Sequence, residues 1–223
     1  MERNRSFPED GSMEKVFRSS KNEIKKGTSV LGGNRNSIRT LHKKIRADMK
    51  KEDVNEKSRH ICELLLKSEW YRNCSVIYGY YPLRNEVDCL PFLIQALRDG
   101  KRVALPRTDS FTASMEFYEI TSLEQVKEGN FHVMEPIVEC PKIQPQNGMC
   151  SVMLVPGVVF DIHGNRYGYG KGYYDRYLAR FFGLVKTIAL AYENQVEQKL
   201  DVLDTDILMD YIYTESGIYQ DRI

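Results

Sequence analysis

The sequence predicts an α/β protein with an open, mostly parallel sheet that carries helices on both faces. Runs rich in β-branched and aromatic residues alternate with helical patterns along most of the chain. Glycine, proline and other turn residues flank the strongest of these runs. That run leads into a glycine-rich stretch and then a helix, an order in which ligands bind beyond the carboxyl ends of strands.

Length and charge indicate one domain with a local binding site. The chain has 223 residues, 42% of them hydrophobic, and a net charge of +1. Residues 1–34 are polar and aperiodic, so we expect a disordered extension there and a single α/β domain over 35–223. The near-neutral charge argues against nucleic acid as a partner, and any anion site must be local.

The cysteines and the hydropathy pattern predict a cytoplasmic protein. Five scattered cysteines form no CxxC pair and no zinc spacing, which is typical of reduced thiols in a reducing compartment. No run of about 18 apolar residues is present, so no membrane partner is expected.

The first predicted helix begins near Ser37 and carries two arginines at its start. Apolar residues recur there at spacings of three and four, which predicts one buried face: Ile38, Leu41, Ile45 and Met49. Arg35 and Arg39 lie one turn apart on this helix.

The remaining elements follow in alternation. A second amphipathic helix carries Ile61, Leu64 and Leu65. Strands are predicted over 75–82, 101–106, 115–120, 150–161, 186–192 and 210–216, the last of these ending the fold. Helices are predicted over 91–100 and 173–182, with a short one over 122–126 that Ser122 caps.

The stretch GNRYGYGKGYYDRYLAR, residues 164–180, carries the strongest functional signal. Its order of strand, turn, glycines and helix places free N–H groups beside Arg166 and Lys171, which suits a phosphate. It is neither a Walker A loop nor a GxGxxG fingerprint. Spacing alone therefore leaves two interpretations open, a phosphate cradle and a structural glycine turn. Asp175 is equally open: it could hold Mg²⁺ beside a phosphate or simply favour the helix N-terminus.

The segment LVPGVVFDIHGNRYGYGKGYYDRYL resembles the signature of the 5-formyltetrahydrofolate cyclo-ligase family, also called methenyltetrahydrofolate synthetases. The resemblance extends over roughly residues 35–216. It includes the paired basic residues Arg35 and Arg39, Glu86 in YYPLRNEVD, the MEP tripeptide at 134–136, and Asp206 in DTDILMDYIYTE. Arg35 stands where lysine is more usual in the family, and the two are not interchangeable in geometry.

The resemblance implies an ATP- and Mg²⁺-dependent enzyme that closes 5-formyltetrahydrofolate to 5,10-methenyltetrahydrofolate, releasing ADP and phosphate. The folate could be polyglutamylated, and we expect a monomer. Two rival functions stay open at this point. One is a related ATP-using ligase with a different acceptor, and the other is a non-catalytic module that binds a nucleotide or folate.

The resemblance also implies roles for individual residues. Lys171 and Arg166 would be catalytic through the transferring phosphoryl group. The nucleotide would be held by Arg35, Arg39, Arg166, Tyr167, Gly168, Tyr169, Gly170, Lys171, Gly172, Tyr173 and Tyr174. The folate would contact Tyr81, Glu86, Phe131, Tyr169 and Tyr173. Asp175 and Asp206 would bind the magnesium ion.

Overall fold

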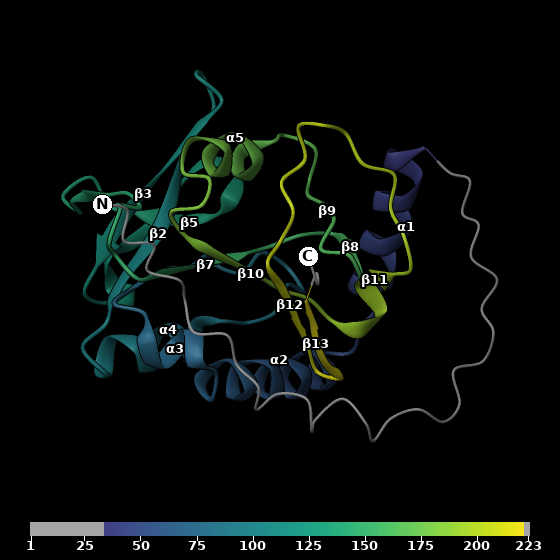
Figure 1. Cartoon of the computed structure of the whole chain (residues 1–223), viewed down its shortest axis with the longest axis horizontal. Coiled ribbons are helices and arrows are strands. Elements are labelled where there is room, and N and C mark those ends of the chain that lie inside the picture. The colour runs from purple at the N-terminus through teal and green to yellow at the C-terminus, as the bar shows by residue number, and fades with distance from the viewer. Residues whose placement is uncertain (1–33, 221–223) are drawn as a thin grey trace, which may run out of the picture. The chain divides into compact units, whose positions relative to one another are not determined.

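The computed structural model describes residues 34–220, which belong to one compact unit (Figure 1). The predicted extension over 1–34 lies outside the described residues except for Asn34. No helix within the described part is long and apolar enough to cross a membrane.

An eight-stranded sheet forms the centre of the unit, in the order β13-β12-β10-β7-β1-β2-β3-β6. Its strands are β1 (Val76–Tyr78), β2 (Arg102–Asp109), β3 (Ser114–Ile120), β6 (Lys142–Ile143), β7 (Ser151–Val155), β10 (Lys186–Leu190), β12 (Tyr211–Thr214) and β13 (Gly217–Gln220). The five inner strands, from β12 to β2, are mutually parallel, and the outer pairings are antiparallel. The predicted open, mostly parallel sheet is confirmed.

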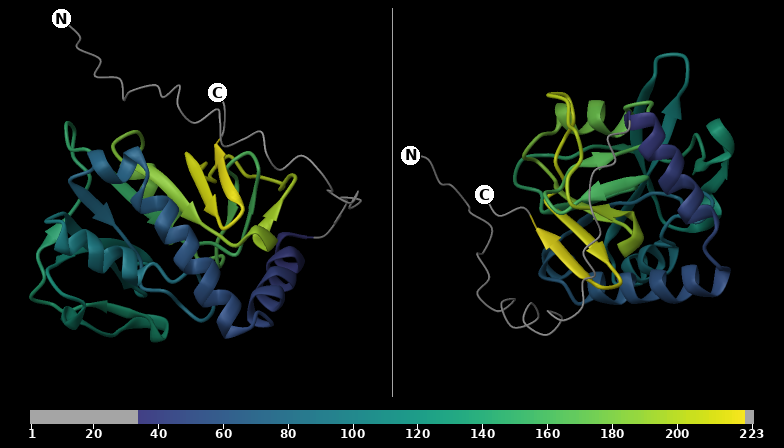
Figure 2. Two further views of the ribbon diagram at one scale, coloured as in Figure 1. Left: turned by 90° about the horizontal axis from the view of Figure 1, so that it is seen from below. Right: turned by 90° about the vertical axis from the view of Figure 1, so that its right-hand side faces the viewer.

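Helices cover both faces of this sheet, which explains why its central strands are apolar on both sides. The helices are α1 (Arg35–Ala47), α2 (Lys51–Leu66), α3 (Glu69–Asn73), α4 (Leu90–Arg98) and α5 (Tyr173–Arg180). Residues of α2, α3 and α4 pack with Ile77 and its neighbours on one face, and Figure 2 shows α2 running along it. Tyr177 and Leu178 of α5 pack on the opposite face against Val76 and Tyr78.

The β-type run predicted over 150–161 is divided between two sheets. β7 ends at Val155, and β8 (Val159–Asp161) joins a three-stranded sheet with β9 (Arg166–Tyr167) and β11 (Val196–Glu197). Between β7 and β8 the chain turns at Pro156 and Gly157. A Cβ atom at Gly157 would lie 2.4 Å from the Phe160 ring, so this turn is closed tightly over that side chain.

The buried face of α1 differs from the predicted one. Ile38 is buried as expected, but the residues that continue its stripe are His42 and Arg46, whereas Leu41 is 40% exposed. The reason is that α1 packs on the three-stranded sheet, beside β8, β9 and β11 (Figure 1). There His42 Nε2 lies 3.0 Å from Glu197 Oε1.

The remaining elements are short. The predicted helix over 122–126 is a 3₁₀ turn, η2 (Leu123–Gln125), and Ser122 caps it as expected by accepting a bond from the Glu124 amide. Two further 3₁₀ turns are η3 (Asn130–His132) and η4 (Glu193–Gln195), and β4 (Val126–Glu128) pairs with β5 (Met134–Pro136). β12 is not the last strand, because β13 follows it as a hairpin partner.

Candidate active site

A cavity of about 960 Å³ lies beyond the carboxyl ends of β1, β2 and β7. Tyr81 and Glu86 follow β1, Thr108 lies near the end of β2, and Pro156 follows β7 directly. Ligands of open α/β sheets bind at this edge. The cavity is therefore where the fold class predicts a site, and every residue predicted from the sequence lines it except Tyr167.

The glycine loop, residues Gly168–Gly172, joins β9 to α5 along one wall of the cavity. Gly170 and Gly172 have φ angles of +94° and +66°, which side chains rarely adopt. Gly172 is also the N-cap of α5 and provides no capping side chain. The first amide groups of α5 therefore have no side-chain cap and begin at the cavity, as an anion site requires.

Arginines from two elements converge on this loop. Arg166 is buried, and it donates to Pro156 O at 3.3 Å and to Asp175 Oδ1 at 2.8 Å. Arg39 Nε of α1 donates to Gly168 O at 2.9 Å, and Arg35 of the same helix forms an ion pair with Asp206 at 2.7 Å. Burial and the nearby Arg35 lower the pKa of Arg39. Three arginine side chains are thus held beside the loop, and two of them already form ion pairs with carboxylates.

Lys171 differs from these arginines because its side chain is available. It is exposed at the tip of the glycine loop, and it has no hydrogen-bond or ion-pair partner among residues 34–220. A mobile, unpaired ammonium group beside a cradle of amides is suited to following a phosphoryl group as it moves.

Tyr167 lies behind the cavity wall and does not line the cavity. Its side chain is fully buried, and its hydroxyl group donates to Asp201 O. The guanidinium groups of Arg35 and Arg39 lie over its ring, 4.3 and 5.4 Å from the centroid. Tyr167 therefore supports the two arginines through cation–π contacts, and its direct contact with a nucleotide stays a prediction.

Glu86 lines the same cavity as the glycine loop. It is only 5% exposed, and it accepts hydrogen bonds from the Tyr169 hydroxyl at 2.6 Å and the Leu83 amide at 2.8 Å. Burial raises the pKa of Glu86, while the Arg46 guanidinium opposes that shift. Since Tyr169 belongs to the glycine loop, its hydroxyl group connects Glu86 to that loop.

Two aromatic rings form a rim near the glycine loop. Phe131 is 52% exposed and its ring centroid lies 6.3 Å from that of Tyr173, the first residue of α5. The backbone of Phe131 has a φ angle of +58°, a strained conformation for a bulky residue. Strain of this kind concentrates at ligand sites, and here it holds an apolar ring at the mouth of the cavity.

The two carboxylates predicted to bind a metal both line the cavity, but each is paired with an arginine. Asp175 accepts from Arg166, and Asp206 accepts from Arg35 and from the Leu203 amide. The described residues contain no cluster of three or more side chains that could hold a metal ion alone. These oxygens fit Mg²⁺, which binds through one or two carboxylates together with substrate phosphates.

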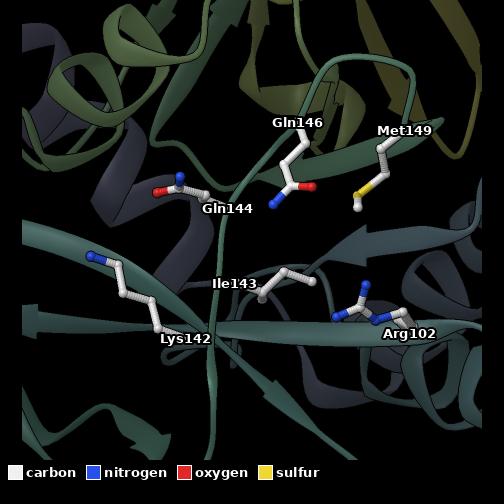
Figure 3. Close-up of a pocket in the computed structure, with 6 residues that line it drawn as sticks. All are labelled: Arg102, Lys142, Ile143, Gln144, Gln146 and Met149. Atoms are coloured by element: carbon white, nitrogen blue, oxygen red, sulfur yellow. The ribbon is translucent and has the colours of Figure 1, made fainter.

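A second, smaller cavity of about 410 Å³ lies at the sheet edge formed by β6 (Figure 3). Its two basic residues are Arg102 and Lys142, and each already forms an ion pair, with Glu119 and Glu116 respectively. The remaining lining residues are Ile143, Gln144, Gln146 and Met149. This cavity has neither a glycine loop nor an unpaired cation, so the larger cavity is the candidate site.

Several charged residues of the cavity and one residue behind its wall were not predicted from the sequence. Lys43, Arg84 and Glu135 line the cavity, and Arg46 contacts two of its wall segments from behind. The sequence does contain a signal for Arg46, because it continues the i, i+4 series of Ile38 and His42. That series is recognised as a buried face only once α1 is seen to pack on the small sheet.

The fold and the site define an α/β protein in which one large cavity combines a glycine-rich loop suited to phosphate with a buried carboxylate. The chain belongs to the 5-formyltetrahydrofolate cyclo-ligase family, whose sequence model matches residues 32–215.

Individual relatives agree with this assignment. A probable 5-formyltetrahydrofolate cyclo-ligase of Caenorhabditis elegans is 24% identical over 193 residues, which cover 81% of this chain and 92% of the relative. The 5-formyltetrahydrofolate cyclo-ligase of Escherichia coli K12 is 29% identical over 137 residues, 60% of this chain and 75% of the relative.

Solved structures agree as well. The structure of Aquifex aeolicus 5,10-methenyltetrahydrofolate synthetase matches with a TM-score of 0.74 at 29% identity, covering 85% of this chain and 93% of that one. A 5,10-methenyltetrahydrofolate synthetase from Mycoplasma pneumoniae shares the fold, with a TM-score of 0.65 at 23% identity over 82% of this chain and 99% of that one.

Proposed function

We propose that this protein converts 5-formyltetrahydrofolate to 5,10-methenyltetrahydrofolate with ATP, releasing ADP and phosphate. One observation carries the proposal: a single cavity holds both the glycine loop and the buried Glu86, and Tyr169 joins them. A triphosphate bound at the loop and a folate bound at Glu86 would share this cavity, with their reacting groups side by side. The family membership and the names of the relatives support the same reaction.

The nucleotide end supplies positioning and positive charge. The loop amides, Arg35, Arg39 and Arg166 would hold the phosphates, and Lys171 would follow the γ-phosphoryl group. That group passes to the formyl oxygen, so a P–O bond forms there as the bond to ADP breaks. The substrate's own N10 then attacks the activated carbon and expels phosphate, with its proton passing to solvent. No protein nucleophile is needed, because catalysis rests on orientation and charge neutralisation.

The folate end supplies recognition. The carboxylate of Glu86 suits the N–H and amino edge of a pterin, with which it would form charge-assisted hydrogen bonds. Tyr81 lies next to it, and the rings of Phe131 and Tyr173 provide apolar faces for flat groups. Tyr169 would contact both substrates.

Asp175 and Asp206 would hold Mg²⁺ when the nucleotide is bound. The ion would neutralise phosphate charge and orient the phosphate oxygens for in-line transfer. Arg166 and Arg35, which now pair with these carboxylates, are the same arginines proposed to contact the phosphates.

We also propose a monomeric, cytoplasmic enzyme that accepts folates with one or more glutamates. The described residues of one chain provide all walls of the cavity, and all five cysteines are free thiols. Lys43 and Arg84 give the wall near Glu86 a cationic character that matches an acidic tail. Neither nucleic acid nor a membrane is part of the proposal.

The test is a direct assay. The protein is mixed with 5-formyltetrahydrofolate, ATP and Mg²⁺, and the near-ultraviolet absorbance of the methenyl product is followed. Nucleotide binding without turnover on any folate would instead favour a binding module, and ATP hydrolysis without a folate product would favour a ligase with another acceptor. Either result would reject the proposed reaction.

A further inference from the structure

Arg46 contacts the site from behind its wall. It lies on the last turn of α1, is 4% exposed and does not line the cavity. Its Nη1 donates to Gly157 O at 2.9 Å and lies 3.9 Å from Glu86 Oε1, and its Nη2 donates to the Tyr169 hydroxyl oxygen. One buried guanidinium group thus reaches the β7–β8 turn, the glycine loop and Glu86.

The chemistry of these groups fixes the direction of the hydrogen bond between Arg46 and Tyr169. A guanidinium group only donates, so the Tyr169 oxygen must accept from Arg46. The single hydroxyl proton of Tyr169 is then directed to Glu86 Oε1, at 2.6 Å. The Leu83 amide donates to Glu86 Oε2 at 2.8 Å. Both oxygens of Glu86 accept, which is the pattern of an ionised carboxylate.

Two side-chain amides, those of Asn85 and Gln195, help to fix the position of Arg46. Asn85 Nδ2 donates to Arg46 O at 3.0 Å, so the end of α1 is tied to the loop that carries Glu86. Gln195 Nε2 donates to the same Gly157 carbonyl that Arg46 binds. The guanidinium group is therefore held by a network and is not a chance surface contact.

We propose that Arg46 is a positioning residue, which orients the Tyr169 hydroxyl group and keeps Glu86 a carboxylate directed at the folate. The inference rests on the proposed function, because it assigns the folate end of the cavity to Glu86. Arg46 would touch neither substrate, but it would set the protonation state of Glu86, which is proposed to contact the folate.

Other groups around Glu86 act in both directions. The titratable and charged side chains that face it are Arg46 of α1, Arg84 and Cys89 of its own segment, Tyr80 after β1, Tyr169 of the glycine loop and Tyr174 of α5. Burial raises the pKa of Glu86, and Arg46 is the largest opposing influence. Removing Arg46 must therefore raise this pKa further.

The first experiment reads Glu86 without any substrate. ¹³C-carboxyl NMR titration of Glu86 is compared between the wild type, Arg46→Met and the control Lys44→Gln, which removes an exposed charge from the same helix. We expect the pKa of Glu86 to rise by about one unit or more in Arg46→Met, as loss of an opposite charge at this distance predicts. Lys44→Gln should leave it unchanged.

The second experiment uses steady-state kinetics across pH. Arg46→Met should raise KM for the folate by about tenfold while KM for ATP changes by less than about twofold, and the acidic limb of kcat/KM should move to higher pH. Arg46→Lys should restore the acidic limb, because the charge returns, but not the folate KM, because lysine lacks the planar fork.

The outcomes separate this inference from the proposed reaction. An unchanged Glu86 titration in folded Arg46→Met, or equal losses for both substrates, would overturn the role of Arg46. If Arg46→Met does not fold, Tyr169→Phe tests the same hydroxyl group, and an unaltered folate KM there would also overturn it. A wild type without folate turnover rejects the reaction, whereas the NMR titration still tests Arg46.

Discussion

Gly164→Ala should destabilise the protein strongly because two independent penalties meet at this residue. Gly164 follows β8 and has a φ angle of +87°, where an alanine costs roughly 1–2 kcal/mol. A Cβ atom there would also lie 2.6 Å from Met209 O, a backbone atom that cannot rotate away. Forcing such a contact in a packed region costs roughly 1–3 kcal/mol more.

The sum is about 3 kcal/mol, which for a chain of this size lowers Tm by about 6–12 °C. Gly183→Ala is the matched control, since Gly183 has a φ angle of +74° but nothing within 4 Å of a new Cβ atom. It should lose only the backbone contribution of roughly 1–2 kcal/mol, which lowers Tm by about 2–8 °C. Urea and thermal unfolding of both variants measure the difference, which isolates the contact with Met209.

The same substitution should also reach the nucleotide end. Met209 N donates to Gly164 O at 2.9 Å, and Asp206 lies three residues before Met209 in the same loop. A displaced loop should weaken ATP binding in Gly164→Ala and leave it unchanged in Gly183→Ala. Equal loss of stability in the two variants, or a Gly164→Ala protein as stable as the parent, would refute the steric argument.

Two further predictions concern the phosphate cradle and the thiols. Lys171→Ala should reduce kcat by about 10²-fold or more without changing Tm, since the side chain has no partner among the described residues, and retained turnover would contradict its phosphoryl role. Burial raises the pKa of Cys62 to about 12 and of Cys74 to about 11, so both should resist alkylation at pH 8 until the protein unfolds. The stability that these raised pKa values provide is fully present below the ordinary thiol pKa of 9.0, so the free energy of unfolding should fall as pH rises from there toward 12. A flat pH profile in that window, or rapid alkylation of the native protein, would contradict the buried placement.

Local patterns were sufficient to predict the sheet and the glycine loop. The glycine loop could be predicted because its φ requirements, its lysine and the following helix all lie within ten residues of sequence. The buried face of α1 could not, because the spacing of Ile38, Leu41 and Ile45 is compatible with more than one orientation. The partner sheet decides the orientation, and β8, β9 and β11 come from segments up to 160 residues away.

The same limit applied within the site. Tyr167 and Tyr169 differ by two residues in one motif, yet one supports the arginines from below and the other lines the cavity. Arg46 was not predicted because its role depends on Gly157 and Glu86, which are distant in sequence. Motif spacing therefore predicted which loop lines the cavity. The long-range hydrogen bonds and cation–π contacts show which side chains lie behind the cavity wall.

The division of the 150–161 run between two sheets gives the enzyme a modular architecture. The large sheet carries the segment proposed to bind the folate, whereas the small sheet leads into the loop proposed to hold the phosphates. Substitutions in the segments that follow β1 and β2 could therefore change which acceptor binds while the glycine loop stays as it is. The Tyr169 hydroxyl group joins the two segments by its hydrogen bond to Glu86, so a change at this contact would affect both of them.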